Sequence, residues 1–140
     1  MVQRTIIDTG PLVTLLTLKG EHASWTLTYW KKLKPPLLTC EPVLSEAAFL
    51  LNRAKLDAIA LFALVERDLI EIDFSIQKEW GALRALMRRY KNVPMSLADA
   101  CLVRQSELHS DSVIFTLDSD FRIYRKHTNR MIPLLLPPNK

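Results

Sequence analysis

Short runs of apolar residues recur along the chain and predict buried strands. Each run is four to six residues long, and the segments between them leave room for helices. The predicted strands cover residues 5–8, 37–40, 69–73, 112–117 and 131–136.

The segments between these runs place apolar residues three and four positions apart, as in helices with one buried face. Pro11 suits a first helical turn and Gly20 a helix end, while Pro42 and Ser96 stand where two further helices begin. The predicted helices cover about 11–20, 22–34, 42–51, 55–67, 75–90 and 96–109.

The alternation of strands and helices predicts an α/β fold, with a parallel sheet covered by helices on both faces. At 140 residues, the chain is expected to form a single domain over 1–140. Its composition of 49% hydrophobic and 24% charged residues is that of a folded protein with a substantial core. In such sheets, ligands bind beyond the carboxyl ends of the strands.

Acidic residues recur at that place in the predicted fold. Asp8 closes the first strand, Glu46 and Asp99 lie in the first turns of helices, and Asp118 follows the fourth strand. Because the carboxyl ends of parallel strands share one edge, these four side chains are expected to converge. Clustered carboxylates need raised pKa values or a cation, and oxygen ligands favour Mg²⁺ or Mn²⁺.

Each acid also has a structural explanation. Asp8 fits a helix cap, and Ser96 with Asp99 fits a capping box. Glu46 lies at the margin of an apolar helical face, where it could pair with Arg53. Taken singly, none of these residues establishes a metal site.

Two aspartates stand close together in IFTLDSDF (114–121). Asp118 is the better candidate for a metal ligand because it directly follows the strand. Asp120 is expected to cap a short helix beginning at Phe121, or to serve as a second-rank ligand. Thr116 has a hydroxyl that could orient a neighbouring carboxylate.

The net charge of +4 and the pI of about 9.2 favour a polyanionic partner only slightly. The basic residues are clustered, although each cluster is also typical of a solvated helix face. The candidates for RNA contacts are Arg84, Arg88, Arg89, Lys91 and Arg122. In the helix over 75–90, the arginines are expected to face outward and Trp80, Leu83, Met87 and Tyr90 inward.

Several other kinds of protein are disfavoured. Cys40 and Cys101 match no metal-ligand spacing or secreted disulfide framework, which favours buried thiols in a reducing cytoplasm. The N-terminus lacks a signal-peptide pattern, and no apolar run is long enough to span a membrane. The three histidines share no motif and are expected at the surface, which disfavours a metal-independent nuclease. Asp73 suits a receiver-type phosphoacceptor domain, but the last strand has no lysine near its end.

The chain resembles PIN domains, in particular the compact VapC-like toxins of prokaryotic toxin–antitoxin pairs. The resemblance rests on IIDTGPL (6–12), PVLSEAAFLL (42–51), MSLADAC (95–101) and IFTLDSDF (114–121), and it covers nearly the whole chain. One departure is Thr-Gly-Pro after Asp8, where many relatives have a serine nearby. Thr9 can take that role, whereas Gly10 contributes no side chain.

The resemblance implies a three-layer α/β/α fold with strand order 3-2-1-4-5 and a metal-dependent ribonuclease activity. Carried over by position, Asp8, Glu46, Asp99 and Asp118 would be catalytic and metal-binding, Asp120 an auxiliary ligand, and Thr9 and Thr116 supporting residues. One or two Mg²⁺ or Mn²⁺ ions would be the cofactor.

The implied partners are an RNA substrate, a cognate antitoxin and a second copy in a homodimer. The aromatic face formed by Trp25, Tyr29 and Trp30 suits either a partner surface or ordinary core packing. The alternative function is a catalytically silent PIN-like module that binds RNA or protein.

Overall fold

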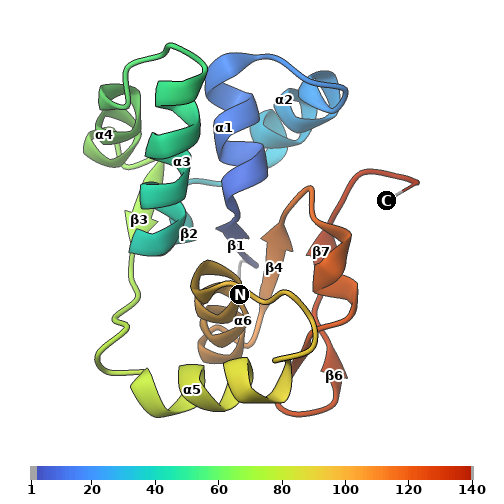
Figure 1. The fold of residues 1–140 in the computed structure, drawn as a ribbon. Helices are drawn as coiled ribbons and strands as arrows, with labels where there is room; N and C mark the ends of the chain where they lie inside the picture. The colour runs from blue at the N-terminus through green and yellow to red at the C-terminus, as the bar shows by residue number, and fades with distance from the viewer. Residues whose placement is uncertain (1–2, 140) are drawn as a thin grey trace.

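The sheet of this protein consists of five parallel strands in the order β3-β2-β1-β4-β7 (Figure 1). A computed structural model describes residues 3–139. A short antiparallel hairpin precedes the last strand of the sheet. Its strands, β5 (Arg125–Lys126) and β6 (Arg130–Met131), have two residues each. The predicted order 3-2-1-4-5 is therefore confirmed, with β7 as the fifth strand. The sheet strands are β1 (Arg4–Ile7), β2 (Leu37–Thr39), β3 (Ile70–Ile72), β4 (Ser112–Phe115) and β7 (Leu134–Leu135).

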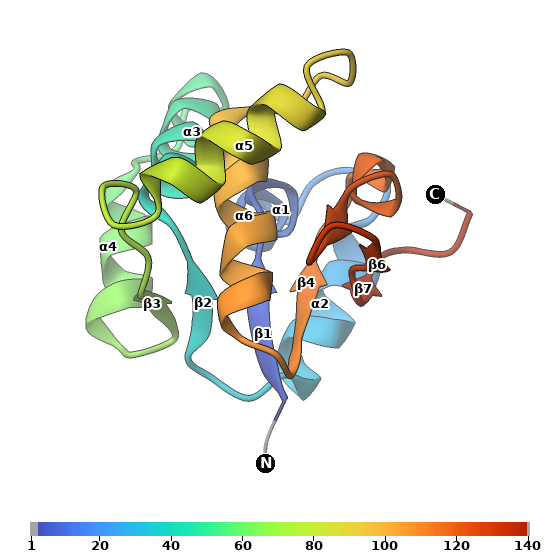
Figure 2. The same ribbon diagram turned by 90° about the horizontal axis from the view of Figure 1, so that it is seen from below.

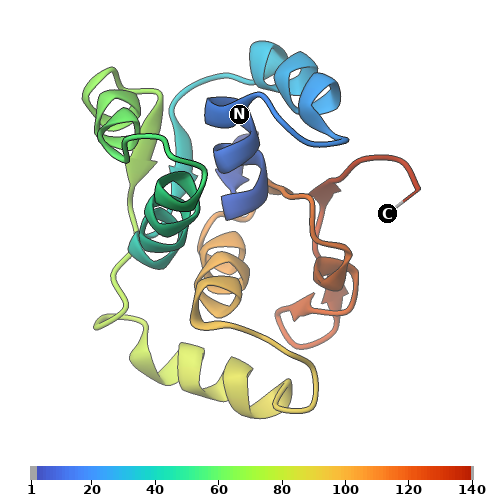
Figure 3. The ribbon, with the colours of Figure 1, turned by 45° about the horizontal axis from the view of Figure 1, so that its top comes forward.

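Helices cover both faces of this sheet. On one face, α6 packs against β1 and β4, and α5 crosses over α6; α2 lies on the other face (Figure 2). Figure 3 shows α1 between α2 and α3, and α1 contacts both of these helices. The helices are α1 (Thr9–Thr17), α2 (Ala23–Lys32), α3 (Glu41–Arg53), α4 (Ile59–Glu66), α5 (Trp80–Arg89), α6 (Leu97–Leu108) and the short 3₁₀ helix η1 (Ser119–Arg122).

The core lies on both sides of the central strands. Ile6 and Ile7 of β1, Leu38 of β2 and Ile114 and Phe115 of β4 are fully buried. Continuous apolar runs suit such strands because helices cover both faces of the sheet. Burying them holds the carboxyl ends of β1 and β4 in register, since Ile7 pairs with Phe115.

Some predicted boundaries differ from the structure. The first helix ends at Thr17, with Leu18 in the left-handed conformation, rather than at Gly20. The helix predicted over 55–67 begins only at Ile59, because Lys55 has a positive φ and Asp57 accepts a hydrogen bond from Ile59 N. Within 131–136, only Leu134–Leu135 joins the sheet.

The prediction that Trp80 faces inward is wrong. The helix predicted over 75–90 begins at Trp80, whose side chain is 61% exposed. Leu83, Leu86 and Tyr90 form the buried face. At 3.6 residues per turn, Trp80 falls at the edge of that face, beside the solvent.

The aromatic residues of α2 are half-buried and pack against the core. The Trp25 ring lies 5.6 Å from the Phe115 ring and 5.0 Å from the Tyr29 ring, centroid to centroid. Core packing therefore accounts for this face.

Cys40 and Cys101 are buried free thiols, as predicted. Among residues 3–139, no helix has the length and apolar character needed to cross a membrane.

Candidate active site

An open pocket of about 500 Å³ lies where β1 and β4 end. Its lining comes from four segments of the chain, and each segment contributes one carboxylate. The four acids that the sequence predicts as a group thus surround one pocket, which we call the acid pocket. It is lined by Asp8, Thr9, Gly10, Glu46, Leu50, Ser96, Asp99, Leu117, Asp118 and Ser119.

Asp8 is held at the base of the pocket by hydrogen bonds to both carboxylate oxygens. Its Oδ1 accepts from Thr9 N at 2.7 Å and caps α1. Its Oδ2 accepts from Thr116 Oγ1 at 2.7 Å, and that hydroxyl accepts from Asp118 N at 2.9 Å. Thr116 therefore joins the ends of β1 and β4, and Asp8 is both a helix cap and a pocket acid.

Glu46 stands on α3 with an exposed side chain. Its Oε2 accepts a hydrogen bond from Thr9 Oγ1 at 3.2 Å, which links α3 to the start of α1. Within residues 3–139, Glu46 forms no ion pair with Arg53, whose guanidinium lies 5.8 Å from the centre of the Phe49 ring. The contact with Thr9 turns Glu46 toward the other acids of the pocket.

Asp99 is fixed at the start of α6 by three hydrogen bonds. Ser96 Oγ accepts from Asp99 N at 3.0 Å, and Asp99 Oδ2 accepts from Ser96 N at 3.1 Å, forming the predicted capping box. Tyr124 Oη donates to the same Oδ2 at 3.3 Å. The helix cap and the pocket acid are again one side chain.

Asp118, rather than Asp120, caps η1. The Oδ1 atom of Asp118 accepts a hydrogen bond from Asp120 N at 2.9 Å. The prediction that Asp120 is the cap is wrong because the helix begins at Ser119, two residues before the expected Phe121. Asp120 also lies outside the lining of the acid pocket.

Gly10 lies in close contact with the segment after β4. A Cβ atom at this position would lie 3.2 Å from Leu117 Cβ, closer than most side-chain contacts. Glycine thus lets the first turn of α1 approach the loop that carries Asp118.

Burial and mutual repulsion oppose ionisation of the pocket acids. Burial raises the pKa of Asp8 to about 6, and the charges of Asp99 and Asp118 add smaller increases. The hydrogen bonds from Thr116 and Thr9 lower this pKa but do not cancel the effect of burial. Burial likewise raises the pKa of Asp99, as does the charge of Asp118, against the hydrogen bond from Ser96. Burial and the charge of Asp99 raise the pKa of Tyr124, so its hydroxyl remains a donor.

The donor chemistry of the pocket fits a hard divalent cation, since every candidate ligand is a carboxylate oxygen. Glu46 Oε1, Asp99 Oδ1 and Asp118 Oδ2 accept no hydrogen bond within residues 3–139, so each could bind an ion. In the same range, no three acidic, histidine or cysteine side chains are placed so that they could hold one ion together.

A family model for the PIN domain matches residues 5–126, which is most of the chain. The chain belongs to the PIN domain family. No curated protein matches it. PIN domains are generally nucleases, and they usually use divalent metal ions.

The predicted basic residues of this PIN domain do not all border the same hollow among the described residues. Arg84, Arg88 and Lys91 line a groove on α5, while the Arg89 guanidinium lies 5.2 Å from the centre of the Tyr90 ring and borders a different hollow. Arg122 is exposed on η1. The candidate RNA-binding residues therefore lie on α5 and η1 and border different hollows, and their contact with RNA stays a prediction.

Asp73 lies outside the lining of the acid pocket of this PIN domain. Its Oδ1 accepts from Gln105 Nε2 at 2.7 Å, and its Oδ2 lies 2.9 Å from His109 Nε2. Of the histidines predicted at the surface, His127 is exposed, whereas the side chains of His22 and His109 are half-buried, with 21% and 25% exposed.

Sequence reasoning missed Tyr124 as a contact of the acid pocket. It is fully buried and stands 25 positions after Asp99, in a segment without a motif that would pair the two. Ser96 was predicted as a cap but not as part of the pocket lining. For Ser96, the capping box next to Asp99 was a usable indication.

We predict that Thr116→Val lowers the free energy of unfolding by about 1–3 kcal/mol, because it removes the buried donor to Asp8 and the acceptor for Asp118 N. Urea unfolding at neutral pH in EDTA measures this change. The matched control is Thr26→Val, because the Thr26 hydroxyl is buried without a hydrogen-bond partner among the described residues. Equal effects of the two substitutions would contradict the assigned role of Thr116.

We predict that Asp8→Asn changes how stability depends on pH. Because folding raises the pKa of Asp8 from 3.8 to about 6, folding favours the protonated carboxyl, and stability is lost as pH rises through this interval. Relative to Asp8→Asn, the wild type should lose up to about 3 kcal/mol between roughly pH 4 and pH 7 in EDTA. Unfolding free energies at several pH values test this, with the exposed Asp68→Asn as the control.

Proposed function

We propose that this protein is a metal-dependent endoribonuclease that hydrolyses RNA phosphodiesters. The observation that supports this most directly is the meeting of four carboxylates, from four separate segments of a PIN domain, around one pocket. A silent binding module would have no need of these four charges, whose proximity opposes ionisation of Asp8 and Asp99.

Asp8, Glu46, Asp99 and Asp118 would hold the cation, with Asp120 as an auxiliary ligand. When bound, Mg²⁺ or Mn²⁺ would supply positive charge for the phosphate and a nucleophilic water near neutral pH. The protein's contribution is to orient its acids. Thr116 fixes Asp8, Thr9 holds Glu46, and Ser96 with Tyr124 holds Asp99. These contacts leave the second oxygens of Glu46 and Asp99 for the ion.

A toxin-type role is the more specific part of this proposal. The VapC-like resemblance of the four acidic motifs supports a toxin that acts on cytoplasmic RNA, is restrained by a cognate antitoxin, and forms a homodimer. Antitoxins of this kind commonly block the acidic pocket with a basic side chain, and an open pocket lined by four carboxylates suits such an inhibitor.

We predict that the purified protein cleaves single-stranded RNA with Mg²⁺ or Mn²⁺ and that EDTA abolishes cleavage. Asp99→Asn should lower the cleavage rate more than about 100-fold, since loss of an outer-shell partner alone costs about 10–100-fold. The amide can still accept from Ser96 N, so the capping box is retained. Gel analysis of labelled RNA measures the rates.

Asp68→Asn is the matched control for this experiment because it makes the same chemical change at an exposed site. It should cleave at the wild-type rate. Cleavage that survives both EDTA and Asp99→Asn would rule out the metal-dependent site. RNA binding without cleavage by the wild type would favour the silent binding module. A rise in melting temperature with Mn²⁺ in the wild type, absent in Asp99→Asn, reports metal binding independently of activity.

We predict that Asp118→Asn abolishes most activity, whereas Asp120→Asn lowers it less than about tenfold. Asp118 lines the pocket and Asp120 does not. Asparagine at position 118 keeps the oxygen that accepts from Asp120 N, so η1 should remain capped and any loss of activity reports the missing charge. Single-turnover cleavage rates compare the two variants, and the reverse ranking would refute the assignment.

A further inference from the structure

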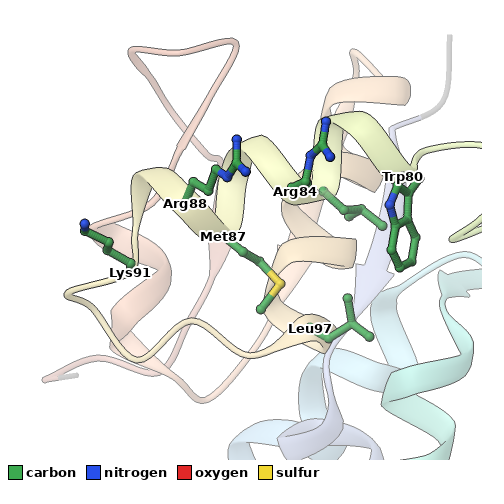
Figure 4. Close-up of a pocket in the computed structure, with 7 residues that line it drawn as sticks. Trp80, Arg84, Met87, Arg88, Lys91 and Leu97 are labelled. Carbon is green, nitrogen blue, oxygen red and sulfur yellow. The ribbon is translucent and has the colours of Figure 1, made fainter.

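A second cavity, of about 360 Å³, lies between α5 and the first residue of α6. Its lining is apolar and includes Trp80, Met87 and Leu97, while Arg84, Arg88 and Lys91 contribute the aliphatic parts of their side chains. The guanidinium groups of Arg84 and Arg88 point away from Met87 and Leu97 (Figure 4). We call it the α5 groove. Figure 4 shows the Trp80 and Met87 side chains extending from α5 toward Leu97, with Lys91 at the far end of the helix.

The α5 groove exposes apolar surface that folding would ordinarily bury. Trp80 is 61% exposed and Leu97 is 40% exposed. An exposed indole in a cavity provides a flat apolar face for another planar group. The buried contacts of Leu83, Leu86 and Tyr90 fix α5 in the orientation that leaves this indole in solvent.

The basic residues that border the groove lie on the same side of α5 as Trp80. Trp80, Arg84, Arg88 and Lys91 are separated by three or four residues, so they lie along one side of the helix. No acidic residue lines the groove within the described chain. The groove is therefore an apolar, aromatic hollow bordered by positive charges.

The α5 groove and the acid pocket meet at the start of α6. Leu97 lines the groove, whereas Ser96 and Asp99, on either side of it in the sequence, line the acid pocket. A strand with a phosphate at the acids would therefore have its neighbouring nucleotides close to α5. This continuity favours one extended ligand over two unrelated ones.

We propose that the α5 groove binds a nucleobase of the RNA strand, stacked on the Trp80 indole, while Arg84, Arg88 and Lys91 contact the adjacent phosphates. The proposal rests on the nuclease function proposed above and extends it to a specific contact with the substrate. Base stacking on aromatic side chains, combined with a basic groove, is how single-stranded nucleic acids are held without sequence-specific contacts.

Charge argues against a second copy of this chain in the groove. If the α5 helices of two copies packed against each other across a twofold axis, Arg84, Arg88 and Lys91 of each protomer would lie close to the same residues of the other. Like charges placed together in an interface cost several kcal/mol. A single-stranded polyanion with planar bases matches both the charge and the aromatic face.

The test is binding of a short, fluorescein-labelled, single-stranded RNA in EDTA, measured by fluorescence anisotropy on the full chain without cleavage. Trp80→Ala should weaken binding about 5- to 140-fold, since stacking contributes about 1–3 kcal/mol per base. Trp80→Phe should retain most of the affinity. The matched control is Phe62→Ala on α4, which removes an equally exposed aromatic ring from another surface.

Removing one base at a time from the RNA identifies the stacked nucleotide. At one position of the RNA, an abasic nucleotide should weaken binding by the wild-type protein as much as Trp80→Ala weakens binding of the intact RNA. The same abasic RNA should bind the Trp80→Ala variant as well as the intact RNA does. If the penalty of Trp80→Ala is instead the same for every abasic RNA, the stacked base is refuted. Unfolding measurements on Trp80→Ala and Trp80→Phe verify that both variants are folded.

Arg88 and Arg89 give a matched test of the phosphate contacts. Arg88→Ala should reduce the slope of log affinity against log salt concentration by about 0.7, the value for one phosphate contact on a single strand. Arg89→Ala should leave the slope unchanged because Arg89 lies outside the groove. Equal slopes for the two variants would refute these contacts.

The outcomes separate this proposal from the proposed function. Metal-dependent cleavage with unchanged binding by Trp80→Ala would refute the groove and leave the nuclease standing. Trp80-dependent binding without cleavage would support the groove and refute the nuclease. Absence of RNA binding in EDTA would refute the groove, and cleavage with Mg²⁺ or Mn²⁺ then decides the nuclease separately. Conversion of a dimer to a monomer by Trp80→Ala would assign the groove to self-association and overturn its role in RNA binding.

Discussion

The hydroxyl of Thr116 is the contact on which the acid pocket depends. It donates to Asp8 at the end of β1 and accepts from the backbone of Asp118 after β4, and it is completely buried. Parallel pairing of β1 with β4 places the hydroxyl beside Asp8, because Ile7 and Phe115 are partners in the register. One buried side chain thus couples the sheet to the positions of two acids whose charges repel each other.

The carboxylates around the pocket are held by contacts that also end or begin secondary structure. Asp8 and Asp118 each accept a hydrogen bond from a backbone N–H of the helix that they cap, and Asp99, in the first turn of α6, accepts one from the N-cap residue Ser96. Such bonds stabilise the negative charge, while burial opposes it for Asp8 and Asp99. The hydrogen bonds at the helix ends therefore offset part of the cost of burying these charges, and protonation of Asp8 is linked to folding.

The acid pocket and the α5 groove make opposite electrostatic demands on a ligand. The pocket is anionic and, by itself, repels a phosphate, whereas the neighbouring groove carries three cations and an exposed indole. A nucleic acid can satisfy both only if a cation occupies the pocket. The two adjoining surfaces therefore suit a nucleic acid together with a divalent metal ion better than either surface does alone.

The sequence determined the main features of the fold because they depend on local patterns. Short apolar runs identified the sheet strands, and the S-x-x-D pattern at Ser96 and Asp99 identified a real capping box. The strand order came from the PIN resemblance rather than from periodicity. Grouping Asp8, Glu46, Asp99 and Asp118 at one edge followed from the rule for parallel sheets, and these residues do line one pocket.

Only the tertiary structure decided features that depend on distant residues or on small rotations. The exposure of Trp80 depends on which side of α5 packs against α6. The spacing of apolar residues does not fix the rotation of the helix closely enough to tell whether a residue at the edge of the buried face is covered. The contact of Tyr124 with Asp99 joins segments that share no motif. The cap of η1 is Asp118 rather than Asp120 because the helix starts two residues earlier than expected. The sequence by itself therefore determined which residues are chemically able to act, and packing decided which of them face one another.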